Sequence, residues 1–382
     1  MNIENFGDTT VKIQKIELEQ NKRIIVVSDI HGYVNYLDGV LKKVGYSNRD
    51  ALIIVGDIIE KGPESLKTVQ YVLKLQEENS NVYATMGNVD YGMLEDYFDN
   101  SQEGNSNFIK GLKWSKNVWK CGFFLDILDE LEIDYDEITE ENVNEVKFRM
   151  GEKYEKELNF FKNLPTILNI GKFIFVHAGI PIDCLQELEG TECFSYLKQD
   201  AFMNTDVTFQ KTVVVGHWPV CMYREDIDCM NPIFNYEKHI IAIDGGCALK
   251  NGAQLNALLI PDANVGMEEV TYTSYDDFPV IVAAASQEEK KPSIVIRYFD
   301  CQVELLAEIG DMAKIRHISS GKELMAPKSY LYEGRDGLYC SDYTNTRLEV
   351  NCGDMLSVIE KTSVGYIVKK DGVIGWYKEE KE

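Results

Sequence analysis

Five short apolar runs, each followed closely by polar residues of types that bind metal ions, constrain the fold of this chain most strongly. Valine and isoleucine dominate the runs, which is typical of buried β-strands. The runs are Ile24–Val27, Leu52–Val55, Val82–Ala84, Phe173–Val176 and Val213–Val215. The motifs that follow are Asp29-Ile30-His31-Gly32, Gly56-Asp57, Gly87-Asn88, His177-Ala178-Gly179 and Gly216-His217. Because the carboxyl ends of strands in an open α/β sheet line the ligand crevice, the pattern predicts one shared site.

The polar residues of these motifs form a ligand set for metal ions. They are Asp29, His31, Asp57, Asn88, His177 and His217. Carboxylate oxygens, imidazoles and an amide oxygen suit borderline cations such as manganese, iron or zinc. A single Gly-Asp or Gly-His pair after a strand is usually a tight turn with a polar cap. However, the chain has 5 histidines, and those at positions 31, 177 and 217 all stand at strand ends, which favours a metal site. His239 and His317 lack this setting, and we predict structural or surface roles for them.

Periodicity predicts how the elements are joined. Leu37, Val40, Leu41 and Val44 follow the first strand at helical spacing, so a β-α-β unit with parallel strands is expected. A hairpin is expected over 167–176, and further strands over 212–215, 240–243 and 255–260.

The length of 382 residues predicts more than one folded core. We predict an α/β catalytic domain over residues 1–262 with a helical insertion over about 91–164. A connector with short strands is expected over 263–322, and a small all-β domain over 323–382. Because domains carry their own cores, the catalytic domain is expected to fold without roughly the last ninety residues.

Composition narrows the partners. The formal net charge is −24, which argues against nucleic-acid and anionic membrane partners. The 9 cysteines include no Cys-x-x-Cys pair, as expected for reduced thiols in a cytoplasmic protein. Neither a signal peptide nor a run of eighteen apolar residues is apparent, so no membrane span is expected.

The ordered motifs resemble those of calcineurin-like metallophosphoesterases. The similarity extends from Arg23 to about Pro261 and is greatest to the branch of Ser/Thr protein phosphatases and symmetrical diadenosine tetraphosphatases. That branch's second and third motifs correspond to Gly56-Asp57-Ile58-Ile59-Glu60-Lys61-Gly62 and Gly87-Asn88-Val89-Asp90. Many more distant phosphoesterases have a histidine where this chain has Pro219, which favours the same branch.

The resemblance implies a fold and a ligand assignment. The implied fold is a β-sandwich of two sheets flanked by helices. Asp29 and His31 would hold one ion, with Asn88, His177 and His217 holding a second and Asp57 bridging both. Two such ions, with manganese expected first, would activate a hydroxide that attacks phosphorus directly.

The chain departs from the family pattern at several positions. Val89 replaces the histidine that protonates the leaving group, Glu60 replaces the aspartate that orients it, and Lys61 replaces a phosphate-binding arginine. We therefore predict Asp57, Glu60 and Lys61 as catalytic residues, with Glu60 as a substitute proton donor. Asp90 competes for that role, and both carboxylates are alternatively residues that orient ligands or water.

A second family arginine normally lies between the last two histidine motifs. Residues 184–216 contain none, so Lys198 and Lys211 are the candidates to replace it. Esters with good leaving groups are the expected substrates.

The C-terminal segment resembles a bacterial SH3-like module. Its signature includes Asp371-Gly372 between two strand-like runs, a strong hairpin pattern. Tyr330, Tyr332, Tyr366 and Trp376 either form an exposed peptide-binding surface or fill a small barrel core. Both interpretations stay open at this point.

Two classes of function follow. The first is a metal-dependent phosphatase acting on phosphoprotein or a small phosphoester, with dinucleoside tetraphosphate hydrolysis as the alternative within it. The second is a weakly active or inactive metal-binding scaffold that acts through the SH3-like module. Because all six ligand positions are intact, the enzyme is favoured.

Overall fold

The computed structural model describes residues 10–291 and 294–378, which form two compact units. The first comprises the chain up to Pro219 together with Pro232–Ala248 and Leu255–Tyr275. The second comprises Val220–Asn231, Leu249–Gln254 and the chain from Asp276 onward. The contiguous domain boundaries drawn from the sequence stay predictions.

The first unit contains two packed sheets, and this β-sandwich is the metallophosphatase fold predicted from the sequence. One sheet has the order β1-β5-β6-β7-β9-β8 and the other β11-β10-β2-β3-β4. The strands are β1 (Ile13–Ile16), β2 (Ile24–Val27), β3 (Ala51–Val55), β4 (Val82–Thr85), β5 (Ile167–Ile170), β6 (Phe173–Val176), β7 (Thr212–Val215), β8 (Ile233–Asn235), β9 (Ile240–Ala242), β10 (Leu255–Ile260) and β11 (Thr271–Tyr275). The expected hairpin is the antiparallel β5–β6 pair.

Parallel pairing places the motif-bearing strand ends together. β2, β3 and β4 run parallel in one sheet, and β6, β7 and β9 run parallel in the other. Side chains from both sheets form one buried core, including Val26, Ile53, Phe175, Val214 and Ile241. Burying each such side chain stabilises the fold by about 1.5–3 kcal/mol.

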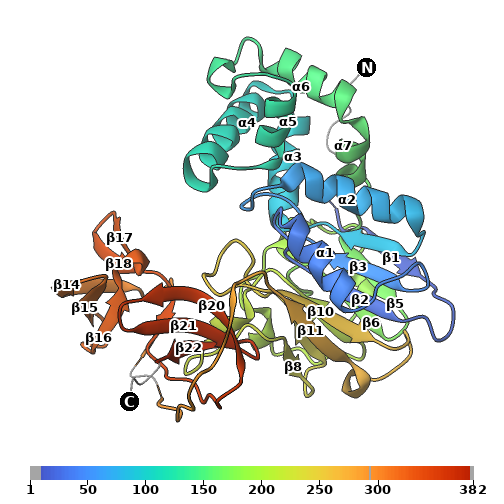
Figure 1. Cartoon of the computed structure of the whole chain (residues 1–382). Coiled ribbons are helices and arrows are strands. Elements are labelled where there is room, and N and C mark those ends of the chain that lie inside the picture. Colours follow the sequence, from blue (N-terminus) through green and yellow to red (C-terminus); the bar gives the residue numbers. More distant parts are fainter. Residues whose placement is uncertain (1–9, 292–293, 379–382) are drawn as a thin grey trace. The chain divides into compact units, whose positions relative to one another are not determined.

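Helices connect and cover these strands. α1 (Val34–Lys43) and α2 (Ser65–Glu78) join the parallel strands β2, β3 and β4, and α1 buries Leu37, Val40 and Leu41 as its periodicity predicts. A helical insertion lies between β4 and β5, and Figure 1 shows α4, α5 and α6 gathered into one group. The insertion consists of α3 (Asn88–Phe98), α4 (Gln102–Trp114), the π-helix η1 (Ser115–Trp119), α5 (Phe123–Glu130), the 3₁₀ helix η2 (Tyr135–Glu137), α6 (Val143–Lys153) and α7 (Glu155–Lys162). Shorter helical turns are α8 (Leu185–Leu188), α9 (Phe194–Leu197), η3 (Phe202–Asn204), η4 (Val220–Tyr223), η5 (Met267–Glu269) and η6 (Lys328–Tyr330). Among the described residues, no helix is long and apolar enough to cross a bilayer.

The second unit is built mainly of antiparallel strands. Its sheets have the orders β12-β20-β21-β22 and β16-β15-β14-β18-β17, with β13 and β19 forming a separate pair. The strands are β12 (Val280–Val282), β13 (Val295–Ile296), β14 (Gln302–Ile309), β15 (Met312–His317), β16 (Glu323–Pro327), β17 (Leu331–Gly334), β18 (Gly337–Cys340), β19 (Tyr343–Thr344), β20 (Met355–Thr362), β21 (Gly365–Lys370) and β22 (Val373–Tyr377).

Two details of this unit bear on the SH3-like interpretation. Asp371 and Gly372 have φ of +50° and +77° between β21 and β22, which confirms the predicted tight hairpin. Tyr330 and Trp376 are buried, and the Trp376 indole N–H donates to the Tyr343 hydroxyl at 2.9 Å. These two aromatic residues therefore fill a core, whereas Tyr332 is exposed.

Candidate metal centre

The predicted ligand residues lie on loops that leave the strand ends in strained backbone conformations. Asp29, His31, Asp57 and His217 have φ of +53°, +48°, +49° and +64°. Residues with side chains seldom adopt this left-handed region, and such strain clusters at functional sites. Backbone hydrogen bonds hold the first two loops together, from Asp29 N to Gly56 O at 3.1 Å and from His31 N to Asp57 O at 3.0 Å.

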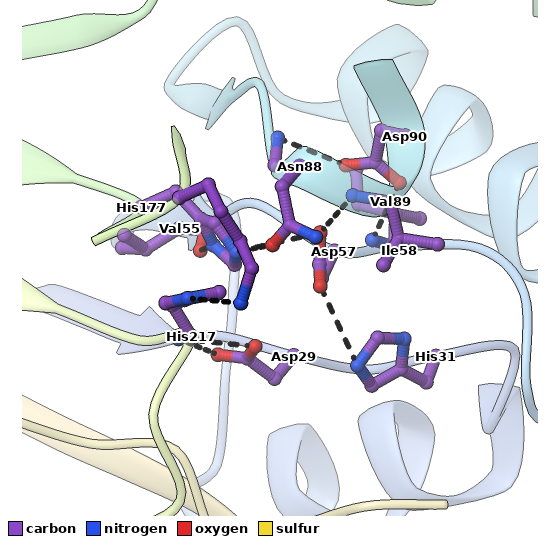
Figure 2. Close-up of polar contacts among 12 residues, drawn as sticks. Asp29, His31, Val55, Asp57, Ile58, Asn88, Val89, Asp90, His177 and His217 are labelled. Atoms are coloured by element: carbon purple, nitrogen blue, oxygen red, sulfur yellow. Dashed lines mark hydrogen bonds and ion pairs between the residues drawn. The ribbon is translucent and has the colours of Figure 1, made fainter. Parts of the chain in front are cut away.

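The six predicted ligands converge on one place (Figure 2). Ligand atoms of Asp29, Asp57 and His177 all lie within 4.8 Å of one another. The Asp57 carboxylate lies between two imidazoles, with Oδ2 at 3.6 Å from His31 Nε2 and Oδ1 at 3.4 Å from His177 Nε2. This placement fits the predicted bridging role of Asp57.

The two remaining ligands approach from other elements. Asn88, the first residue of α3, places Oδ1 at 3.1 Å from His177 Nε2. The backbone N–H of His217 donates to both carboxylate oxygens of Asp29, at 3.1 and 3.0 Å. Each ligand is thus held in place by another.

Hydrogen bonds to backbone carbonyls orient two of the imidazoles. His31 Nδ1 lies 3.2 Å from Ile59 O, and His177 Nδ1 lies 3.0 Å from Val55 O. A carbonyl accepts a hydrogen bond, so Nδ1 of each ring carries a hydrogen, and Nε2 is the nitrogen that faces Asp57. Carbonyl partners of this kind commonly fix the tautomer of metal-binding histidines.

The motif glycines make room for the carboxylates. A Cβ on Gly87 would collide with the backbone nitrogen and Oδ1 of Asp57, and one on Gly216 would collide with Oδ2 of Asp29. Larger residues at these positions would therefore displace the ligands.

Buried carboxylates give this cluster an excess of negative charge, which favours cation binding. Burial raises the pKa of Asp29 well above its ordinary range, and the carboxylates of Asp244 and Asp57 add to the rise. Burial also lowers the pKa of His31 to about 3 and that of His217 to about 4, so both imidazoles are neutral at neutral pH. Burial opposes the change, but the charge of Asp57 raises the pKa of His177 to about 10, so this ring must lose a proton before it binds a metal. Two neutral imidazoles beside crowded buried carboxylates nevertheless fit divalent ions, which bind the former and neutralise the latter.

Asp244 is a site residue that the sequence analysis missed. It follows β9 directly beyond Ile243, whose backbone N–H donates to Val215 O at 2.9 Å, so it lies level with His217 on the neighbouring strand. Oδ1 accepts from Gly246 N at 2.7 Å, whereas Oδ2 is buried and has no hydrogen-bond partner among the described residues. A strand followed by Asp-Gly-Gly repeats the pattern used for the other ligands, and that signal could have found it.

The carboxylates of Glu60 and Asp90 accept hydrogen bonds from protein groups. The Glu60 carboxylate accepts from Phe123 N at 2.7 Å and from Ser115 Oγ at 3.0 Å. Asp90 Oδ1 accepts from the backbone of residues 58 and 59 at 2.9 and 3.2 Å, and Oδ2 accepts from Gly87 N at 3.2 Å. Both side chains are fully buried, and burial raises the pKa of each to about 7.

Val89 contributes only backbone chemistry. Its N–H donates to Asp57 Oδ1 at 2.9 Å, which helps to orient the bridging carboxylate. Its side chain has no proton to give a leaving group.

The candidate phosphate-binding cations differ in position. Lys61 Nζ lies 3.3 Å from His31 Nε2, and Lys198 Nζ lies 3.4 Å from His217 Nε2. Lys198 also pairs with Asp200 at 2.7 Å. Lys211 instead donates to Asn169 Oδ1 at 2.6 Å and to Gly171 O at 2.7 Å, so it is committed to the β5–β6 turn.

Comparison with known proteins agrees with this geometry. The model of the family described as calcineurin-like phosphoesterase matches residues 22–232. The asymmetrical bis(5'-nucleosyl)-tetraphosphatase PrpE of Oceanobacillus iheyensis is 25% identical over 264 residues, which cover 63% of this chain and 89% of that protein. PrpE of Anoxybacillus flavithermus is 25% identical over 280 residues, covering 65% and 93%. A solved Saccharomyces cerevisiae protein serine/threonine phosphatase is 13% identical with a TM-score of 0.41, covering 71% of this chain and 85% of that one.

Proposed function

The chain belongs to the calcineurin-like phosphoesterase family of metal-dependent hydrolases, and we propose that it prefers substrates with weakly basic leaving groups, dinucleoside tetraphosphates above all. The observation that carries this proposal is the absence of a proton donor in the position of Val89. The two carboxylates predicted as substitutes, Glu60 and Asp90, are both held by hydrogen bonds to protein groups.

The chemistry follows from this absence. General acid catalysis typically contributes a factor of about 10²–10⁴ when the leaving group is strongly basic, as a serine alkoxide is. Cleavage of a phosphoanhydride releases a nucleotide phosphate, which is a much weaker base and leaves without a proton. An enzyme with Val89 therefore loses little on an anhydride and much on a phosphoserine.

We assign the ions to the residues as the family pattern implies. Asp29 and His31 would hold one divalent ion, and Asn88, His177 and His217 the other, with Asp57 between them and manganese as the first candidate. When bound, two such ions supply an activated water nucleophile and neutralise charge on the phosphoryl group. The single carboxylate between the two imidazoles supports this assignment.

Lys61 and Lys198 are proposed to bind the phosphate oxygens. Each ammonium group lies beside a different predicted histidine ligand, Lys61 beside His31 and Lys198 beside His217. Lysine is a point charge without the bidentate geometry of arginine, so a chain of several phosphates, with more oxygens to share, suits it better than one phosphate. The names of the two PrpE relatives, which specify tetraphosphatases, agree with this substrate class.

Phosphoprotein is the alternative substrate, and a scaffold acting through an SH3-like module with a peptide partner is the alternative of another class. Burial of Tyr330 and Trp376 removes two of the four aromatic residues from any such peptide surface. We further propose a cytoplasmic location, because the 9 cysteines are all free thiols.

Three substrates separate these proposals. Wild-type protein loaded with manganese should hydrolyse diadenosine tetraphosphate and p-nitrophenyl phosphate, and should act on phosphoserine peptides more slowly by about 10²-fold or more. Chromatography of the nucleotide products shows whether cleavage gives ATP with AMP or two ADP. Asp57→Asn should abolish turnover and reduce bound manganese. Comparable rates on phosphoserine peptides and the tetraphosphate would contradict the proposal.

A further inference from the structure

Glu60 lies in the loop that follows β3, three residues after Asp57, in a conformation that needs an external support. Glu60 and Lys61 have φ of +65° and +66°. Two consecutive residues with side chains in the left-handed region are unfavourable unless surrounding contacts impose that conformation.

The support comes from the helical insertion. Both carboxylate oxygens of Glu60 accept from it, one from the first backbone N–H of α5 at Phe123 and one from the hydroxyl of Ser115. A carboxylate at a helix N-terminus is also favoured by the helix dipole. Gly122 lies so close to Glu60 that a Cβ there would meet Oε2 at 2.6 Å. The insertion is therefore shaped around this side chain.

A second acidic residue, this one in the insertion, accepts a hydrogen bond from α2. Asp126 of α5 accepts from Leu66 N, in the first turn of α2, at 3.0 Å. The backbone N–H of Glu60 donates to Ser65 Oγ, also in that turn, at 2.9 Å. The loop thus provides an acceptor, Glu60, for the N-terminus of α5, and α5 provides an acceptor, Asp126, for the N-terminus of α2. Ser65 of α2 in turn accepts from the loop backbone.

The loop of residues 57–61, which begins with the predicted bridging aspartate, is consequently held at two points. Asp90 binds the backbone N–H groups of Ile58 and Ile59, just after the bridging aspartate. The next residue, Glu60, is held by its own side chain. Lys61 follows Glu60 directly, and its Nζ lies 3.3 Å from His31 Nε2. The insertion holds the backbone at Glu60, and the Lys61 side chain starts from the next residue. The insertion therefore determines where the Lys61 ammonium group lies.

We propose that the helical insertion positions Lys61 for phosphate binding through Glu60, which is a positioning residue and not the proton donor. This inference rests on the phosphate-binding role proposed above for Lys61. A π-helix at the contact fits such a coupling, since π-turns inside helical segments are often found at functional sites. Here Lys120 N donates to Ser115 O at 2.7 Å, and this widened turn presents Ser115 to Glu60.

Two conservative substitutions distinguish positioning from acid catalysis because they act in opposite ways. Glu60→Gln cannot act as a carboxylic acid, but its amide oxygen can accept from Phe123 N while its amide nitrogen donates to Ser115 Oγ. Glu60→Asp keeps the acid but is one methylene too short to reach both partners. Positioning predicts a small loss of kcat/KM, about twofold, for Glu60→Gln and a larger loss, about tenfold, for Glu60→Asp.

The dependence on Lys61 is tested by a double-mutant cycle. In a Lys61→Ala background, Glu60→Asp should cause little further loss, because its effect passes through the removed ammonium group. Ser115→Ala should give a smaller loss that is likewise absent in that background. Manganese content should stay close to wild type, and Glu152→Asp on the exposed face of α6 is the matched control.

p-Nitrophenyl phosphate and an alkyl phosphate serve as substrates, so that the result does not depend on the natural one. A loss confined to Glu60→Gln and to the alkyl phosphate would overturn the inference in favour of acid catalysis. Full additivity with Lys61→Ala would overturn it in favour of simple packing. If wild-type protein hydrolyses neither these esters nor diadenosine tetraphosphate, the proposed function fails first. Inorganic phosphate binding to the manganese-loaded variants, measured by calorimetry, then still tests whether Glu60 places Lys61.

Discussion

For some residues at the metal centre the sequence predicts the neighbouring side chains, and for others it does not. The six predicted ligands follow β-strands closely, and strand-end position was enough to predict that they converge (Figure 2). Asp244 follows β9 in the same way and was overlooked, although its Asp-Gly-Gly motif repeats the pattern. Glu60 is different, since its contacts depend on where a distant insertion places Ser115 and Phe123. No local pattern around position 60 indicates those partners.

Asp244 provides a prediction at the residue scale. Its buried, unpartnered oxygen adds negative charge beside Asp29, so it should favour cation binding without being one of the predicted ligands. Asp244→Asn keeps the shape and removes the charge, and we expect manganese affinity to fall by about 10–100-fold, as for other residues that support metal ligands. Calorimetric titration of the metal-free protein measures this, with Asp206→Asn on the exposed surface as the control. Unchanged affinity would remove Asp244 from the metal centre.

At the scale of elements, periodic segments were predictable and irregular ones were not. The parallel strands, α1 and the 371–372 hairpin all appear where apolar runs, helical spacing or turn residues place them. The π-turn at Ser115–Trp119 carries no such signature, because its geometry is imposed by tertiary contacts. The contacts that hold the helices of the insertion together also carry no sequence signature. Lys147 of α6 is fully buried and donates to Asp96 O, Asp99 O and Asn105 Oδ1 at 2.9, 2.8 and 2.9 Å.

Lys147 should therefore be a principal stabilising residue of the insertion. Its ammonium group satisfies carbonyl groups at the end of α3, where a positive charge is also favoured by the helix dipole. Lys147→Met preserves much of the volume but leaves these acceptors without a donor, and we expect a loss of about 3 kcal/mol in the free energy of unfolding. Urea denaturation followed by tryptophan fluorescence measures it. The exposed Lys110→Met variant should be neutral, and equal stability of both variants would show that the Lys147 contacts are dispensable.

At the scale of the whole molecule, the domains predicted from the sequence are contiguous segments of the chain. Composition and motif spacing place a boundary where the recognised family pattern ends. The structure instead assigns Val220–Asn231 and Leu249–Gln254 to the second unit, although each is flanked by segments of the first. A linear pattern cannot indicate such exchange, because the contacts that define a compact unit are made between residues far apart in the chain.

The consequence is that the catalytic unit should not be separable by a single cut. A chain without roughly the last ninety residues would retain Val220–Asn231 but lose the partners of that segment within its own unit. Arg297 Nη1 pairs with Asp228 Oδ1 at 2.9 Å with both side chains buried, and Met230 N donates to Gly372 O at 2.8 Å. Removing the arginine leaves a buried carboxylate uncompensated, which typically costs about 3–5 kcal/mol.

We therefore expect the shortened chain to aggregate or to lose its cooperative unfolding transition, contrary to the independence predicted from the sequence. Soluble yield and calorimetric unfolding of the shortened and full chains measure this difference. The full-length Arg297→Met variant is the informative control, because it breaks the same ion pair while keeping every strand. It should be destabilised but soluble. A shortened chain that unfolds cooperatively and binds manganese as tightly as the full protein would show that residues 220–231 need no partner from the second unit.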